Sequence, residues 1–120
     1  MQLKTYGLVM PYFDLKFSTT DNELANFAKA LALPVRIAIV RIIMTNGNSV
    51  GKESLYSIPF NHETITKHLA ELRRLGIIKA HGLRNSLKYS LDEQLFQQMA
   101  DGFAMLFDSM RTFEPDLQSC

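Results

Sequence analysis

The 120-residue sequence predicts one mainly α-helical domain with a small β-hairpin in its second half. Three observations support this fold class. Apolar residues recur at helical spacing in several segments, and residues that start or stop helices flank these segments. Between residues 77 and 91 the spacing changes to that of short strands. Because a chain of this length buries only one core, we expect a single domain over residues 20–120, preceded by an N-terminal arm over residues 1–19.

The first two predicted helices meet at Pro34. A helix is expected to begin at Thr20, because Thr20–Glu23 has the capping-box pattern, in which a Thr oxygen and a Glu carboxylate accept from free backbone N–H groups. Its apolar face contains Leu24, Phe27 and Leu31. Proline ends this helix and suits the first turn of the next one, which stops at Asn46–Gly47. Since residues 35–43 include few polar side chains, the second helix should be buried on most sides.

A short helix over residues 53–57 and a turn precede the most informative helix, residues 61–76. Asn61 is a suitable N-cap, and Gly76 is a suitable C-terminal stop. One face of this helix is apolar and holds Ile65, Leu69, Leu72 and Leu75. The opposite face is mainly polar or cationic and holds His62, Glu63, Thr66, Lys67, Ala70, Arg73 and Arg74. We expect Glu71, Arg73 and Arg74 to form a solvated face with pairing inside the helix, and His68 to be a partly buried, hydrogen-bonded residue.

Two short strands are predicted at residues 77–81 and 86–91, joined by a turn that contains Gly82 and Asn85, residue types that tolerate positive φ. A long helix follows, from about residue 92 to residue 112. The whole order is therefore a helix-turn-helix followed directly by a β-hairpin wing. Such a unit binds DNA by placing a helix with short polar and cationic side chains in the major groove.

The charge distribution supports this interpretation better than the total, which is only +1. Residues 62–90 carry six Lys or Arg against two Asp or Glu, whereas residues 91–120 carry six acids against Arg111. A basic middle and an acidic end indicate one surface that meets a polyanion and another that avoids it. A chance fluctuation in a solvated surface would explain the charges alone equally well.

Three segments resemble winged-helix regulators of the ArsR/SmtB-like group. LANFAKALALPVRIAIV (residues 24–40) resembles the opening KALADPTRLRIL of that group, with Pro34 and Arg36 in register. TITKHLAELRRLGII (residues 64–78) resembles TVSKHLKVLREAGLV almost position for position, and LKYSL (residues 87–91) resembles the second wing strand. The resemblance covers about residues 24–95, and its specific part is the segment 64–78.

The resemblance implies a repressor that binds a palindromic operator in double-stranded DNA as a homodimer, with an effector whose chemistry the sequence does not identify. The positions that correspond to DNA contacts in the group are His62, Glu63, Thr64, Thr66 and Lys67 in the helix, and Arg84, Asn85 and Lys88 in the wing. Thr64 serves either in these contacts or mainly in the first helical turn.

Dimerisation is expected through the first and last helices, as the resemblance implies. The predicted interface residues are Leu24, Phe27, Leu31, Phe96, Met99, Phe103, Leu106, Phe107 and Met110. One small domain would expose much of this surface as a single apolar patch, which monomers rarely tolerate. Two alternatives stay open: the arm with Tyr12, Phe13 and Phe17 covers the patch within one chain, or the methionines line an effector pocket.

Other function classes find less support in the sequence. Metal sensors of the group carry a Cys-x-Cys pair in the short helix, where this chain has Glu53–Ser57, and its one cysteine is the last residue, Cys120. His62, His68 and His81 are too scattered in the expected fold to form a zinc site, so no metal or cofactor is predicted.

No arrangement of residues typical of a catalytic site is visible in the sequence, and we expect that the protein is not an enzyme. The chain has no membrane-spanning run and no signal-peptide pattern, which favours a cytoplasmic setting. The remaining alternative is a winged helix that binds another protein and not DNA.

Overall fold

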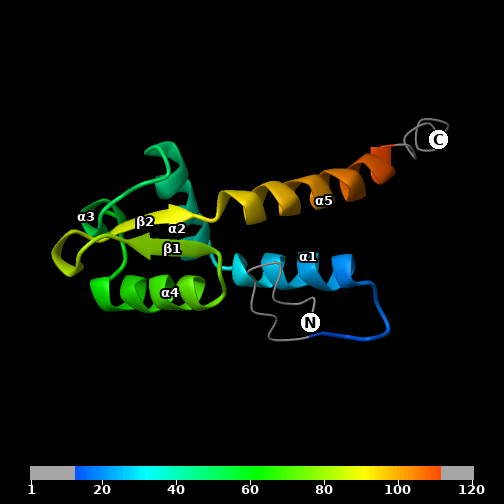
Figure 1. Cartoon of the computed structure of the whole chain (residues 1–120), viewed down its shortest axis with the longest axis horizontal. Coiled ribbons are helices and arrows are strands. Elements are labelled where there is room, and N and C mark those ends of the chain that lie inside the picture. Colours follow the sequence, from blue (N-terminus) through cyan, green and yellow to red (C-terminus); the bar gives the residue numbers. More distant parts are fainter. Residues whose placement is uncertain (1–12, 112–120) are drawn as a thin grey trace.

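The computed structural model describes residues 13–111 and confirms the mainly helical fold with one antiparallel hairpin. The elements are α1 (Thr19–Ala30), α2 (Pro34–Thr45), α3 (Lys52–Leu55), α4 (His62–Arg74), β1 (Ile78–His81), the 3₁₀ turn η2 (Arg84–Ser86), β2 (Lys88–Leu91) and α5 (Glu93–Arg111). We call α2–α4 with the hairpin the helix-turn-helix unit, and α1 with α5 the outer layer. Figure 1 shows the two parts next to each other, with α1 running alongside α5.

The start of α1 differs from the sequence prediction. The N-cap is Ser18, whose Oγ accepts from the backbone N–H of Asp21 at 3.0 Å, so the predicted capping box at Thr20 is wrong. Asn22 is buried and ties the preceding turn to the helix, since its side chain exchanges hydrogen bonds with the backbone of Asp14 at 2.9 and 3.0 Å. Glu23 is also buried instead of capping the helix, and this burial raises the pKa of its carboxyl. Most of the predicted arm, including Tyr12, lies outside the described residues.

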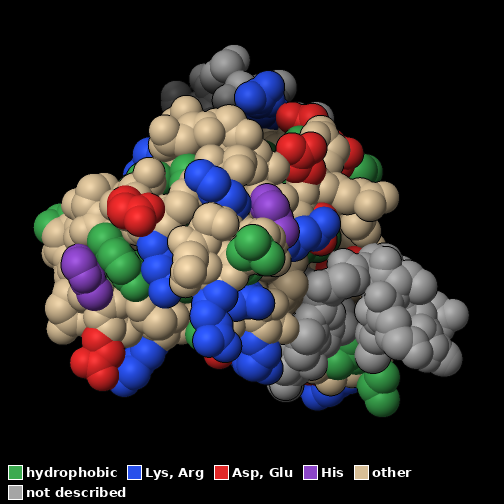
Figure 2. All heavy atoms as spheres, turned by 60° about the vertical axis from the view of Figure 1, so that its left-hand side comes forward, with side chains coloured by type: hydrophobic (Ala, Val, Ile, Leu, Met, Phe, Trp, Pro, Cys, Tyr) green, Lys and Arg blue, Asp and Glu red, His purple; other side chains and the backbone are tan. Residues whose placement is uncertain are grey.

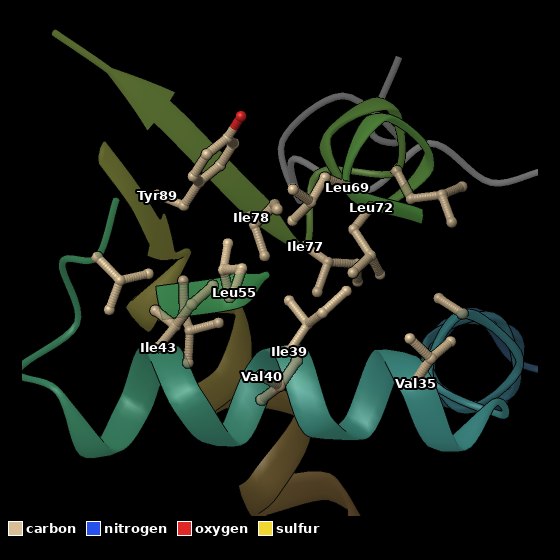
Figure 3. Packing of buried hydrophobic residues seen from close by; sticks show 14 of the residues in the cluster. Val35, Ile39, Val40, Ile43, Leu55, Leu69, Leu72, Ile77, Ile78 and Tyr89 are labelled. Carbon is tan, nitrogen blue, oxygen red and sulfur yellow. The ribbon is translucent and has the colours of Figure 1, made fainter. Parts of the chain in front are cut away.

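The core of the helix-turn-helix unit lies between α2, α4 and the hairpin. Figure 3 shows Ile39 and Ile43 of α2 pointing toward Leu55 of α3 and toward the side chains of α4 and the strands. Ile37 and Met44 are exposed, so the expectation that α2 is buried on most sides is wrong: one of its faces lies in solvent. The buried face of α2 packs against the inner face of α4 and thereby fixes the position of α4.

The hairpin begins directly after α4. Gly76 has a φ of 79°, a left-handed conformation that ends α4 as predicted. The strands pair in antiparallel register from Ile78 opposite Leu91 to His81 opposite Lys88. They are shorter than predicted, because residues 84–86 form the turn η2. The turn requires Gly82, which has a φ of 102° and where an added Cβ would lie 2.9 Å from the Ser86 carbonyl oxygen.

Two connections fasten the hairpin to its surroundings. Val50, in the loop after α2, forms an antiparallel bridge with Tyr89, through N–H···O bonds of 3.1 and 2.7 Å. Only Asp92 separates β2 from α5, and its Oδ1 accepts from the backbone N–H of Leu95 at 3.0 Å. Asp92 therefore caps α5 at the end of the wing. Within residues 13–111, no helix combines the length and the apolar character needed to cross a bilayer.

Candidate nucleic-acid interface

Helix α4 is held at its start and along its inner face. As predicted, Asn61 is the N-cap, and its Oδ1 accepts from the backbone N–H of Thr64 at 2.8 Å. Ile65, Leu69 and Leu72 are almost fully buried against α2 and the hairpin. The orientation of the helix is therefore fixed by packing, which leaves the opposite face free for a ligand.

The outer face of α4 brings together most of the predicted contact residues. His62, Glu63, Thr66 and Lys67 are all exposed on the first two turns of the helix. Thr64 is half-buried in the first turn, beside the Asn61 cap. The exposed group combines polar side chains with one carboxylate and one cation, residue types that contact base edges and phosphates in a major groove.

Tyr56, which follows α3, contacts two of these residues. Its ring stacks on the His62 ring with centroids 4.0 Å apart and an interplanar angle of 10°. Its hydroxyl lies 2.9 Å from Thr66 Oγ1, within hydrogen-bond distance. The sequence pattern alone did not point to Tyr56, because the contact crosses the turn between the two helices. The signal in the sequence was an aromatic residue within the predicted short helix 53–57, and the structure places this residue directly after α3.

His68 is hydrogen-bonded and half-buried, as predicted. Its Nδ1 accepts from Arg36 Nε at 3.1 Å, while Arg36 Nη1 donates to the Ala30 carbonyl oxygen at 2.9 Å. Burial lowers the pKa of His68, and the charge of Arg36 lowers it further. Arg36 thus links α1, α2 and α4, and the neutral His68 that accepts its hydrogen bond carries the ring proton on Nε2. Among residues 13–111, no three His, Cys, Asp or Glu side chains are grouped to hold a metal ion.

The last turn of α4 has the expected intrahelical pair. Arg74 Nη2 lies 2.6 Å from Glu71 Oε2, and the hydrogen bond from Arg74 lowers the pKa of the Glu71 carboxyl. This pair is exposed and contributes little to stability. Arg73 is exposed beside it. The cationic end of α4 is therefore partly neutralised, in contrast to Lys67 nearer the N-terminus.

The wing adds a second group of cations next to α3. Arg84, Asn85 and Lys88 are exposed. They line a polar hollow of about 240 Å³ whose other wall includes Lys52 and Glu53 of α3. The charge pattern of the sequence did not point to Lys52, because this residue lies outside the basic segment 62–90. Figure 2 brings the left-hand side of Figure 1, where α3, α4 and the wing lie, toward the viewer, and Lys and Arg side chains lie across the middle of this view.

The predicted dimer residues divide into three groups by exposure. Phe27 and Met99 are only 5% and 3% exposed, so they belong to the core of the single chain. Leu24, Leu31, Phe96 and Phe103 are half-buried, with the Phe96 ring edge-on to Phe27 at 5.1 Å. The outer end of α5 remains open: Leu106, Phe107 and Met110 are 53%, 59% and 67% exposed.

Comparisons with known proteins agree with this geometry. An ArsR-like transcriptional regulator from Rhodococcus sp. RHA1 superposes with a TM-score of 0.61 at 19% identity, over 85% of this chain and 95% of that one. The Biofilm growth-associated repressor of Xylella fastidiosa is 30% identical over 86 residues, which cover 72% of this chain and 75% of the relative. The chain belongs to the ArsR/SmtB-like family of winged helix-turn-helix transcriptional regulators.

A second relative is an uncharacterized HTH-type transcriptional regulator of Mycobacterium tuberculosis. It is 31% identical over 67 residues, or 56% of this chain, and the match spans only 59% of that relative's length. No family model matches the chain. The matches to these relatives and structures confirm the resemblance to this family that was found in residues 24–95.

Proposed function

We propose that the protein is a homodimeric repressor that reads a palindromic DNA operator with α4 and clamps the adjacent backbone with its wing. The observation that carries the proposal is the outer face of α4, where His62, Thr66 and Lys67 are exposed on a helix whose inner face is locked in the core. Short polar side chains reach base edges, whereas a lysine contacts phosphate and carries no sequence information. Repression follows the example of the Xylella relative, whose name describes a repressor.

The wing cations support the second part of the proposal. Arg84 and Lys88 lie on the same side of the fold as Lys52, around one polar hollow. Cations in this arrangement suit phosphate oxygens of the DNA backbone or a narrow minor groove. Glu53 in the same hollow limits the local positive charge, so the wing is expected to add affinity and not base recognition.

Dimerisation is supported by the apolar outer end of α5. Leu106, Phe107 and Met110 follow one another at helical spacing and are each more than half exposed. A two-fold pairing of outer layers would bury them and present two α4 helices to one face of DNA, about 34 Å apart. A self-complementary interface of this kind implies an operator with two-fold symmetry.

We also propose that an effector, if one acts on this chain, is not sensed through a thiolate pair in the short helix. The stretch Glu53–Ser57 has no cysteine, and Cys120 is the single thiol of the sequence. We propose a cytoplasmic setting, because the relatives described above are regulators of bacteria, in which DNA lies in the cytoplasm.

The test is a selection of bound sequences from random duplex DNA, followed by affinity measurements at several salt concentrations. We expect an inverted repeat, and an affinity whose logarithm falls linearly with the logarithm of salt concentration. Recovery of a single half-site would contradict the dimer but keep the DNA-binding part. An absence of binding even at low salt would favour the alternative, a winged helix that binds a partner protein.

A further inference from the structure

We propose that Tyr56 is a positioning residue for DNA recognition: it holds His62 and Thr66 in one fixed arrangement and thereby sets the sequence preference of α4. The inference rests on the proposed function, because it assigns base reading to the outer face of α4. It adds Tyr56, which follows α3, to the residues that determine how this face contacts bases. Three features support it: a ring stack, a hydrogen bond and the anchoring of Tyr56 itself.

The stack restricts His62, the first residue of α4. An exposed histidine at the start of a helix would otherwise sample several rotamers. Here the Tyr56 ring lies parallel to the imidazole, with centroids 4.0 Å apart, and covers one of its faces. His62 as a whole remains exposed, so the nitrogen atoms on the edge of its ring can still meet a ligand. Because the His62 side chain is already held in one conformation, it loses less conformational entropy when it contacts a base edge, which lowers the entropic cost of binding.

The hydrogen bond fixes Thr66, which lies four residues later on the same face of α4. The Tyr56 and Thr66 hydroxyl oxygens are 2.9 Å apart, and either one can donate. Whichever donates, the pair uses one hydroxyl hydrogen and keeps the other for an outside acceptor. Purine N7, guanine O6 and thymine O4 are the acceptors in the major groove, and their positions differ between base pairs, so a hydroxyl held in one place favours the base pair whose acceptor lies within its reach.

Tyr56 itself is anchored by its own helix. Its backbone N–H donates to the Lys52 carbonyl oxygen at 2.9 Å, and the preceding residue, Leu55, is fully buried. Tyr56 is half-buried, whereas both of its partners are exposed. Because Leu55 and Ile65 already join α3 to α4 in the core, the contacts of Tyr56 add order to the surface more than stability to the fold.

The experiment compares Tyr56→Phe and Tyr56→Leu with the unchanged protein. Each is measured on the selected operator half-site and on its single-base-pair variants. Tyr56→Phe keeps the stack and removes the hydrogen bond, so we expect discrimination to fall about three- to tenfold at one base-pair position. Tyr56→Leu removes both interactions, and discrimination should fall at two positions. Affinity for unrelated duplex should stay within about twofold, since Lys67 is untouched.

Two further variants distinguish a specific positioning role of Tyr56 from a nonspecific loss of order in the turn after α3. Ser57→Ala breaks the bond from Ser57 Oγ to the Ser54 carbonyl oxygen in the same turn, a bond that does not involve α4, and should leave the discrimination profile unchanged. In a Thr66→Ala background, Tyr56→Phe should have no further effect at the first position, because its action passes through the Thr66 hydroxyl. Thermal melting checks that every variant is folded.

The outcomes distinguish this inference from the proposed function. If the unchanged protein binds its operator and Tyr56→Phe and Tyr56→Leu keep its full discrimination, the positioning role is wrong and the DNA-binding function stands. If both variants lose affinity equally for every sequence, Tyr56 is only structural. If the unchanged protein binds no duplex, both proposals fall together.

Discussion

The helix-turn-helix unit and the outer layer differ in how far their apolar residues are buried. In the unit, Ile39, Leu55 and Ile65 are fully buried, and the outer face of α4 is polar and charged, although Ile37, Met44 and Leu83 are exposed elsewhere on the unit. In the outer layer, Leu95 is buried close to the unit, but Phe107 and Met110 at the far end of α5 are mostly exposed. The unit closes a core around α4 within the chain, and its exposed apolar residues are spread over different elements, whereas the outer layer groups its exposed apolar residues at one end of α5.

This difference indicates that the two parts have different roles in the proposed function. A closed core allows the unit to hold α4 rigidly while its surface side chains specialise for a polyanion. An open apolar end is unfavourable in water unless something covers it. The acidic side chains Glu93, Asp101 and Asp108 of α5 would also disfavour contact of the outer layer with DNA in the proposed complex. Stability and recognition should therefore respond to mutations in the unit, and assembly to mutations in α5.

The largest expected effect comes from the closed core. Leu72→Ala removes a fully buried side chain between α4, α2 and the hairpin, so the free energy of unfolding should fall by about 2–5 kcal/mol. Urea denaturation measures this change. The matched control is Leu83→Ala, an exposed leucine in the wing, which should change stability by no more than about 0.5 kcal/mol. Equal effects would contradict the view that the buried core of the unit determines its stability.

The second prediction concerns the open end of α5. Phe107→Asp places a charge in the exposed apolar group and should convert a dimer to a 13.7 kDa monomer at micromolar concentration, as measured by sedimentation. Met105→Asp is the control, because Met105 is exposed on the opposite side of the same helix by its spacing. A monomeric unchanged protein, or dissociation by both variants alike, would contradict the proposed interface.

A smaller effect is expected from a single cation of the unit. Lys67→Ala should weaken binding to all duplexes alike and reduce the slope of log affinity against log salt by about 0.9 for each subunit. Fluorescence anisotropy at several salt concentrations measures both quantities. Lys29→Ala removes the same charge from α1 and should leave the slope unchanged. If Lys67→Ala has no effect at moderate salt, α4 does not dock as proposed.

The wing should add affinity in the same way but without sequence preference. Replacing Arg84 and Lys88 together by alanine should lower the salt slope by up to about 0.9 for every phosphate that each subunit then leaves unneutralised. Titration of the selected site at several salt concentrations measures this slope. The base preference of the site should not change, since these residues are assigned to the backbone. A changed preference would instead place the wing on base edges.

The smallest expected effect is a pH dependence of stability from His68. Because the pKa of His68 is lowered in the fold, the unfolded chain takes up a proton first as the pH falls below about 6.5. The folded protein should therefore lose stability between about pH 6.5 and the lower pKa of the folded state, and show no effect of this group above that range. His68→Gln should reduce the difference in melting temperature between pH 7.5 and pH 5.5. His81→Gln, in an exposed strand position, serves as the control.

Local signals predicted the elements of the unit well. Asn61 and Gly76 mark the ends of α4 because a cap and a left-handed glycine act within a few residues. The predicted N-cap of α1 was Thr20, whereas the structure has Ser18. Serine and threonine cap helices in the same way, so local sequence does not distinguish the two positions. The burial of Asn22 and Glu23 depends on tertiary packing, which local sequence does not show. The Tyr56 contacts were missed for the same reason, because no spacing rule relates residues on either side of a turn.

The joint between β2 and α5 has a mechanical consequence. A strand bridged to Val50 passes through Asp92 alone into a helix of 19 residues, about 28 Å long, so there is no linker to absorb rotation. A tilt of α5 would therefore be passed to the base of the hairpin, and the outer end of the helix would move farthest. The helix and hairpin thus form a lever, in which a large displacement at one end corresponds to a small, firm displacement at the other.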